Sequence, residues 1–291
     1  MKKTYKQALF EGERACFATR NAIFEDCIFQ NGESPLKESA DIKISGGYFR
    51  WKYPLWYCKN VVVRSCSWTE GARAGVWYTE KADIADCVIQ SPKNFRRCKG
   101  LTLTNVFLSN AQETLWTCLD VTLKNVQAKG DYLAMNCENV QVDGLMLDGN
   151  YSFDGAKNVT IRNSRLLTKD AFWNSENITV YDSYIAGEYL GWNSRNLTLV
   201  NCTIESLQGL CYCENVVLRD CKFVNTTLAF EYSVVDAVIT NEVDSVFNPR
   251  HGYIKAPLIK EFILEEGVVK ASDCFIDCSR ILEKKDKPEW K

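Results

Sequence analysis

The sequence is poor in the residues that common catalytic centres require. Its 291 residues include a single histidine, His251, whereas Ser-His-Asp and Cys-His nucleophile systems place that residue type at their centre. His251 lies in the C-terminal region and is expected at the surface. No P-loop and no dinucleotide-binding glycine motif occur. Catalysis, if the protein performs any, must therefore rest on Asp, Glu, Lys, Arg and Tyr.

Long apolar runs and a strong excess of charge are lacking as well. No stretch approaches the roughly 20 apolar residues that span a bilayer, and residues 1–7 do not contain the apolar core of a secretory signal. The formal net charge is −2 at pH 7, which gives no electrostatic reason to expect nucleic acid or an anionic membrane as a partner. We expect a cytoplasmic protein.

Cysteine is abundant, but paired metal-binding motifs are absent. None of the 14 cysteines belongs to a C-x-x-C pair of the kind that zinc and iron–sulfur sites use, so we expect no metal and no other cofactor. Ten of them fall on only two positions of a short repeat, at which other copies carry Ala, Ser, Thr, Gly, Val or Leu. Small thiols buried along a core fit that pattern, and they indicate a reducing compartment.

The repeat itself returns about every 19 residues. Within one copy, apolar residues such as Val61 and Val63 alternate with polar or β-branched ones, which is typical of a strand. An Asn, Asp or Gly follows, and these residues tolerate the left-handed backbone of a tight bend. A fixed period of this length is the signature of a solenoid. The spacing is 19 at each step among Asn139, Asn158, Asn177, Asn196 and Asn215.

Three short strands per repeat, with bends at Asn, predict an all-β fold, a single right-handed parallel β-helix. A leucine-rich repeat would include helical segments, and a propeller blade would need about 40 residues. We expect about eleven coils of roughly 19–21 residues between Ala22 and Val246. Residues 1–246 would form the β-helix with an N-terminal cap, and residues 247–291 a C-terminal cap and charged tail.

One position of the repeat holds five of the eight tryptophans, and Arg96 and Asp154 occupy it in other copies. The position before it is apolar almost throughout, as Leu55 shows. Because adjacent strand residues face opposite ways, the indoles lie outside if Leu55 lies inside. The alternative is an inward core ladder with Arg96 and Asp154 as a structural pair, since a register error of one residue reverses the faces. The tryptophans concerned are Trp56, Trp77, Trp116, Trp173 and Trp192.

A polar rim accompanies this tryptophan file. An aromatic stripe flanked by carboxylates and cations suits an elongated sugar chain, and the charged groups could serve as acid, base or carboxylate clamp. The rim consists of Tyr53, Lys93, Glu113, Tyr132, Tyr151, Asp170 and Tyr189, with Glu188 one step further out. The candidate catalytic residues are Arg96, Lys93, Asp154, Asp170 and Glu188. The candidate ligand-binding residues are Trp56, Trp77, Trp116, Trp173, Trp192, Tyr132, Tyr151 and Tyr189.

Several phrases are distinctive, at residues 73–78, 91–97, 148–155 and 187–193. With them, the chain resembles an uncharacterised bacterial family of right-handed parallel β-helix, pectate-lyase-like proteins over nearly its whole length. Some members of that family are labelled "hydrogenase". The paired C-x-x-C ligands of a nickel–iron centre are absent from this sequence, so that activity is not expected. The architecture is also similar, more loosely, to pectate lyases and polygalacturonases, which bind acidic polysaccharides along one face.

Two functional hypotheses follow. The first is a carbohydrate-binding or carbohydrate-active β-helix that uses its aromatic and charged outer face, with acidic polysaccharide or oligosaccharide among the candidate ligands. Were it an enzyme, it would be a polysaccharide lyase or a glycoside hydrolase. The second is a non-enzymatic scaffold that docks another protein, or another copy of itself, through the same face. The expected partner is an oligosaccharide, with no nucleic acid and no membrane.

Overall fold

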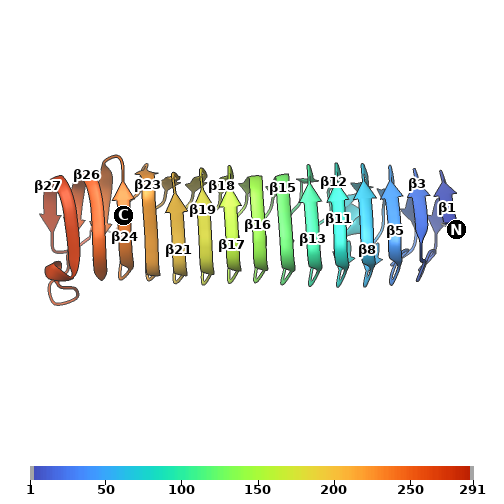
Figure 1. Ribbon diagram of the computed structural model, residues 1–291, viewed down its shortest axis with the longest axis horizontal. Coiled ribbons are helices and arrows are strands. Elements are labelled where there is room, and N and C mark those ends of the chain that lie inside the picture. Colours follow the sequence, from blue (N-terminus) through green and yellow to red (C-terminus); the bar gives the residue numbers. More distant parts are fainter. Residues whose placement is uncertain (1–2, 289–291) are drawn as a thin grey trace. The chain divides into compact units, whose positions relative to one another are not determined.

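The chain is built from strands and bends in the structure, a computed structural model that describes residues 3–288 (Figure 1). It divides into two compact units, Met1–Gly149 (unit 1) and Asn150–Lys291 (unit 2). The only helical segments among the described residues are two short 3₁₀ turns, η1 (Glu70–Ala72) and η2 (Ala271–Asp273). The all-β prediction is confirmed.

Each unit consists of short strands that follow one another closely along the chain. Unit 1 contains β1 (Lys3–Lys6), β2 (Leu9–Glu11), β3 (Ala22–Glu25), β4 (Ile28–Gln30), β5 (Ala40–Ser45), β6 (Tyr48–Phe49), β7 (Leu55–Trp56), β8 (Lys59–Arg64), β9 (Ser67–Trp68), β10 (Val76–Trp77), β11 (Glu80–Ala85), β12 (Val88–Ile89), β13 (Lys99–Thr104), β14 (Phe107–Leu108), β15 (Leu119–Lys129) and β16 (Glu138–Asp148). Unit 2 contains β17 (Lys157–Arg162), β18 (Arg165–Leu167), β19 (Glu176–Tyr181), β20 (Tyr184–Ala186), β21 (Arg195–Val200), β22 (Thr203–Glu205), β23 (Glu214–Phe223), β24 (Val234–Ile239), β25 (Val243–Phe247), β26 (His251–Ile263) and β27 (Cys274–Lys285).

The turn that contains β8 shows how the sequence forms a coil. Val61 and Val63 are buried, because alternate residues of a strand face the same side. Ser65, with φ at 52°, then bends the chain into β9. In the next turn β11 pairs with β8 in parallel, with Ala82 beside Val61 and Ile84 beside Val63. Repetition of this pairing gives the predicted right-handed parallel solenoid.

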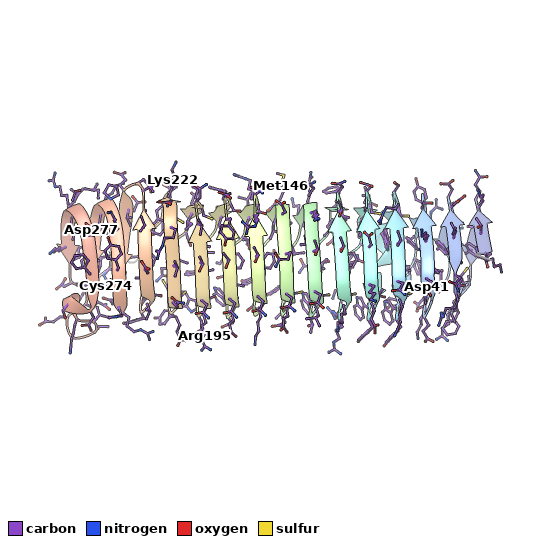
Figure 2. The ribbon with its side chains drawn as sticks, in the orientation of Figure 1. Asp41, Met146, Arg195, Lys222, Cys274 and Asp277 are labelled. Atoms are coloured by element: carbon purple, nitrogen blue, oxygen red, sulfur yellow. The ribbon has the colours of Figure 1, made fainter. Side chains whose placement is uncertain are left out.

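The same alternation holds in a long strand such as β16, on the far side of its bend at Gly144, where φ is 74°. Met146 is 55% exposed and projects from β16 (Figure 2). Its neighbours Leu145 and Leu147 are both buried. Each strand of the solenoid therefore contributes one set of side chains to the core and one set to the outer face.

The predicted count of eleven coils is too low, because the chain makes about 15 turns. Before Ala22, β1 already pairs with β3 in parallel, with Lys3 beside Ala22. After Val246, β26 pairs with β24 and β27 with β26, all in parallel. These end turns lack the Cys and Asn positions of the repeat, so the 19-residue period does not reveal them. Residues 1–2 and 289–291 of the expected end segments lie outside the described residues.

Ladders of side-chain amides connect the bends of successive turns. In unit 2 the Asn177 Nδ2 donates to Asn158 Oδ1 at 3.0 Å, and Asn196 Nδ2 donates to Asn177 Oδ1 at 2.8 Å. Asn177 has φ at 57°, a left-handed conformation that Asn tolerates better than most residues. Asn at these positions therefore serves both the bend and the contact between turns.

The cysteines line the core as free thiols. All 14 lie within the described residues, and 13 of them are buried. The Cys58 Sγ donates to the Leu36 carbonyl at 3.1 Å, and the Cys118 Sγ to the Phe95 carbonyl at 3.1 Å. Burial raises the pKa of Cys58 to about 12. The interpretation of these residues as structural thiols is confirmed.

Replacing Asn177 separates its two roles. Asn177→Gly keeps the left-handed backbone but removes two hydrogen bonds, so we expect it to lower the free energy of unfolding by about 1–2 kcal/mol. Asn177→Ala should cost about 1 kcal/mol more, because its Cβ disfavours a positive φ. Denaturant unfolding followed by circular dichroism measures both. A loss of the same size in both variants would contradict the role of the bend, and an unchanged Gly variant would contradict the role of the ladder.

Candidate functional site

The tryptophan file lies on the outside of the solenoid in both units. The indoles of Trp56 and Trp173 are half-buried, whereas the preceding Leu55 and Phe172 are completely buried. The inward core ladder, the alternative left open by the sequence, is therefore wrong. The same alternation of a half-buried and a buried residue recurs at Val76 and Trp77, Phe95 and Arg96, Leu115 and Trp116, and Phe153 and Asp154.

Three indole N–H groups of this file illustrate how the rings are bonded within the protein. In unit 1 the Trp77 Nε1 donates to the Lys93 carbonyl at 2.7 Å, and the Trp116 Nε1 to the Tyr132 carbonyl at 2.8 Å. In unit 2 the Trp173 Nε1 donates to the Tyr189 carbonyl at 3.0 Å. Each bond reaches the next turn and fixes the orientation of the ring. A ligand can therefore use the faces and edges of these rings, but not their N–H groups.

In unit 1 the faces of the indole rings are covered by neighbouring rings and by the Arg96 guanidinium. Trp56 and Trp77 stack with centroids 4.9 Å apart and planes 6° from parallel. The Arg96 guanidinium lies 4.6 Å from the Trp77 ring centroid and 4.5 Å from that of Trp116, which is within the range of a cation–π interaction. The result is a continuous stack that presents mainly ring edges to solvent.

Lys93 and Arg96, the two cations among the candidate catalytic residues, both lie close to the Glu113 carboxylate beside this stack. The Glu113 carboxylate lies 3.1 Å from the Lys93 Nζ and 3.4 Å from an Arg96 nitrogen. Glu113 belongs to the rim in the sequence but was not among the candidate site residues. The Arg96 Nε is buried and has no hydrogen-bond partner, because the flanking indoles enclose it. The cluster is a cation held between two rings with an anion at its edge.

In unit 2 one residue of the polar rim, Asp170, has a much shorter side chain than its neighbours. Tyr151, Asp170 and Tyr189 occupy equivalent positions of three successive turns. Their backbone N–H groups donate to the carbonyls of Lys169, Glu188 and Leu207 at 2.8, 2.8 and 2.9 Å respectively. Successive turns are about 4.8 Å apart, so Asp170 stands between two tyrosines and is much shorter than either. A cavity of about 360 Å³ opens there, lined by Tyr151, Lys169, Asp170, Trp173, Tyr189 and Trp192.

The aromatic walls of this cavity meet at steep angles. The rings of Tyr151 and Trp173 are 6.5 Å apart with planes at 80°, and those of Tyr189 and Trp192 are 5.7 Å apart at 84°. Trp173 and Trp192 are 6.3 Å apart and tilted by 37°. These centroid distances are too long for the close parallel stacking that Trp56 and Trp77 show in unit 1. The indoles of unit 2 are therefore spread around a hollow.

Asp170 provides the charge at this cavity. Its side chain is 2% exposed, and its Oδ1 is shielded from water and has no hydrogen-bond partner. Burial is the main cause that raises the pKa of Asp170 above its ordinary value of 3.8, and the nearby Glu188 and Asp154 carboxylates act in the same direction. Lys169 opposes them, but its ammonium is paired with Glu188 at 2.9 Å. The cavity thus holds a carboxylate whose negative charge is incompletely compensated.

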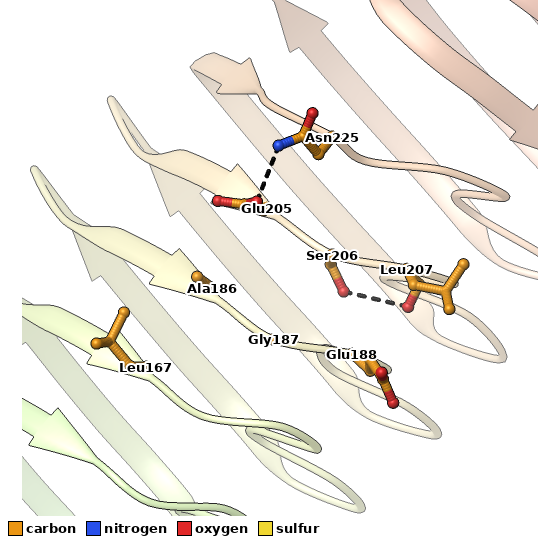
Figure 3. Close-up of a pocket in the computed structure, with 8 residues that line it drawn as sticks. All are labelled: Leu167, Ala186, Gly187, Glu188, Glu205, Ser206, Leu207 and Asn225. Atoms are coloured by element: carbon orange, nitrogen blue, oxygen red, sulfur yellow. Dashed lines mark hydrogen bonds between the residues drawn. The ribbon is translucent and has the colours of Figure 1, made fainter.

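A second cavity of about 410 Å³ lies beside Glu188 and was not anticipated from the sequence. Figure 3 shows its lining side chains on successive turns. The Glu205 carboxylate accepts bonds from Asn225 Nδ2 at 2.9 Å and from the Tyr184 hydroxyl at 2.6 Å, which lowers the pKa of Glu205 and raises that of Tyr184. This carboxylate is already satisfied within the protein. The lining residues are Leu167, Ala186, Gly187, Glu188, Glu205, Ser206, Leu207 and Asn225.

The structure therefore groups the predicted residues into two sets. Sequence reasoning missed Lys169, although its place next to Asp170 in the rim was a signal, and it missed Tyr212, whose ring lies 4.7 Å from Trp192. Asp154 accepts a hydrogen bond from Asn174 at 3.2 Å. The set of unit 1 is Trp56, Trp77, Lys93, Arg96, Trp116 and Tyr132, and the set of unit 2 is Tyr151, Asp154, Asp170, Trp173, Glu188, Tyr189 and Trp192.

The described residues offer no arrangement for a metal ion. Within residues 3–288, no group of three or more His, Cys, Asp or Glu side chains is placed to hold one. His251, the single histidine, is exposed. No helix in this part of the chain is long and apolar enough to cross a membrane.

Comparison with known proteins gives the family. The sequence model of a family described as "Protein of unknown function (DUF3737)" matches residues 3–277. The chain belongs to this family. No curated protein matches the sequence.

Solved structures with a similar course of the chain come from a phage and a bacterium. The tailspike protein of E. coli bacteriophage HK620, solved in complex with pentasaccharide, is 8% identical; the match covers 98% of this chain and 71% of the tailspike chain, with a TM-score of 0.37. PfbA, a surface adhesin of Streptococcus pneumoniae, is 8% identical, with 96% and 83% coverage and a TM-score of 0.38. At such low scores these likenesses carry no argument about a ligand of this chain.

Asp170→Asn tests the burial of the carboxylate. Because the raised pKa means that the folded chain binds more protons than the unfolded chain above pH 3.8, the Asp170 charge destabilises the fold once the pH exceeds that raised pKa. We expect the variant to melt at a higher temperature than wild type at pH 7, and the gain to vanish below about pH 3.8. Thermal melts at several pH values measure it.

Asp220→Asn is the matched control. Asp220 is exposed, has φ at 55°, and occupies a bend at which other turns carry Asn, so the substitution removes the same charge without relieving burial. A pH-dependent gain of equal size in both variants would show that the effect reflects net charge, and would contradict the account of Asp170.

Proposed function

We propose that the protein binds carbohydrate at the aromatic cavity of unit 2. One feature supports this above all: the hollow between Tyr151 and Tyr189 combines indole and phenol walls with a carboxylate floor at Asp170. A sugar ring has apolar C–H faces and a rim of hydroxyl donors. The faces suit aromatic walls, and a hydroxyl can supply the hydrogen bond that Asp170 lacks.

The charges around the cavity limit the class of sugar that can bind there. Asp154, Asp170 and Glu188 contribute to the same local field, and Lys169 is the cation among them. An acidic saccharide would meet repulsion there. For this cavity we therefore propose a neutral or amine-bearing saccharide in place of the acidic one suggested by the looser resemblance to pectate lyases.

We place binding ahead of turnover. Glycoside hydrolases use two carboxyl groups, one that donates a proton and one that acts as base or nucleophile. Asp170, the first candidate, is a buried carboxylate at this cavity. Glu188, the second candidate, is held in an ion pair with Lys169 at 2.9 Å, so its carboxylate is already engaged within the protein. Hydrogenase chemistry is not part of the proposal.

The free core thiols support a reducing, cytoplasmic location as part of the same proposal.

The ligand-binding role of the unit 1 residues stays a prediction. The alternative function, a scaffold without a sugar site, is favoured there by the closed stack of Trp56, Trp77 and Arg96, which leaves little open ring face. Under that alternative, docking of another protein or of a second copy would involve ring edges. Light scattering of wild type, together with sugar binding, separates the two functions.

Two tryptophans at the same position of the repeat provide a matched test. Trp116 and Trp173 both donate their N–H to a tyrosine carbonyl 16 residues later, but only Trp173 lines the cavity. We expect Trp173→Ala to weaken oligosaccharide binding at least about tenfold and Trp116→Ala to leave it unchanged. Calorimetric titration with a panel of neutral, amine-bearing and acidic oligosaccharides measures this.

Thermal melts of both variants check that they remain folded. No binding of any oligosaccharide by wild type would overturn the proposal. An equal loss in both variants would place the site elsewhere than in the unit 2 cavity.

A further inference from the structure

We infer that the unit 2 cavity recognises the ammonium group of an amino sugar. The inference rests on the proposed carbohydrate function and specifies its ligand class. It starts from Asp170, whose Oδ1 has no hydrogen-bond partner although the side chain is 2% exposed. A buried carboxylate oxygen without a partner is costly. A ligand that brings a positive charge and N–H donors compensates it more fully than a neutral hydroxyl.

The arrangement of the rings suits a cation. Tyr151, Trp173, Tyr189 and Trp192 line one hollow, and neighbouring pairs stand at 80° and 84°. Rings at such angles surround a small group from several sides instead of offering one flat platform. Aromatic rings attract a cation that lies over their faces, and enclosure by several rings is how proteins bind alkylammonium groups.

Unit 1 contains an internal example of the same chemistry. There the file supplies its own cation, since the Arg96 guanidinium lies between Trp77 and Trp116 with the Glu113 carboxylate at its edge. In unit 2 the indoles Trp173 and Trp192 are present, but the residues at this position of the file include no Arg or Lys. The ammonium of a ligand would take the role that Arg96 has in unit 1.

The one cation that lines the cavity is already engaged. The Lys169 Nζ is 2.9 Å from the Glu188 carboxylate and lies 5.4 Å from the Tyr189 ring centroid. Its charge is thereby balanced by Glu188, which leaves Asp170 and the nearby Asp154 as the net charge of the site. An amino group on the sugar would thus enter a negative field, whereas acetylation of that group would remove the attraction.

The test compares four probes on the full chain at about pH 6, where a sugar amine is charged. They are a glucosamine tetramer, an N-acetylglucosamine tetramer, a glucose tetramer and choline, each titrated calorimetrically. We expect the glucosamine tetramer to bind at least about tenfold more tightly than the acetylated and neutral tetramers. Choline, which offers the ammonium without a sugar, should bind more weakly than the glucosamine tetramer.

Two substitutions at Asp170 make the test specific, and both are compatible with the fold. Asp170→Asn retains a residue type that tolerates the φ of 56° at this position; it should abolish the preference for the amine. Asp170→Tyr inserts the side chain that the adjacent turns carry and fills the cavity, so it should abolish binding of every probe. Asp220→Asn, an exposed carboxylate of the same unit, should behave as wild type.

The outcomes separate this inference from the proposed function. If the acetylated and neutral tetramers bind as tightly as the glucosamine tetramer, and Asp170→Asn changes nothing, the ammonium inference is overturned while carbohydrate binding stands. If choline alone binds, and loses its affinity in Asp170→Asn, ammonium recognition stands and the sugar is overturned. If no probe binds wild type, both are overturned.

Discussion

Stacking of equivalent residues at a single strand spacing is the constraint on which the rest of this structure depends. Within each unit, each turn pairs with the next in parallel, so residues at one position of the repeat form a file with members about 4.8 Å apart. A side chain in such a file has its counterparts of the adjacent turns as immediate neighbours. The thiols of the core, the amides at the bends and the outer aromatic rings are three consequences of this geometry.

The same constraint makes each irregularity in a file informative. A residue that is larger or charged must be held by its two neighbours, as Arg96 is held by Trp77 and Trp116. A residue that is smaller leaves a space the height of two turns, as Asp170 does between Tyr151 and Tyr189. The two units thus differ from the regular repeat in opposite ways. In unit 1 the Arg96 side chain fills the space between the aromatic rings, whereas in unit 2 the short Asp170 side chain leaves a cavity that a ligand could enter.

Much of this arrangement could be predicted from local patterns. The alternation of Leu55 and Trp56 favoured an outer position for the indoles, because adjacent strand residues face opposite ways. It left the inward alternative open, because a register error of one residue reverses the two faces. The 19-residue period predicted the fold but missed the end turns, where strands such as β26 and β27 pair without the Asn and Cys phrase. The cavity at Asp170 was not predicted from the sequence, because it depends on the relative sizes of the side chains at one position of three successive turns, Tyr151, Asp170 and Tyr189. The second cavity beside Glu205 had no signal in the period at all.

The central claim is that the short side chain at position 170 creates an open, negatively charged site among aromatic rings. A crystal structure of the chain soaked with glucosamine tetramer tests it most directly. The account predicts a sugar residue between Tyr151 and Tyr189, with its amine within hydrogen-bonding distance of the Asp170 carboxylate. A structure in which neighbouring side chains close over Asp170, with the tetramer bound elsewhere on the solenoid, would contradict it.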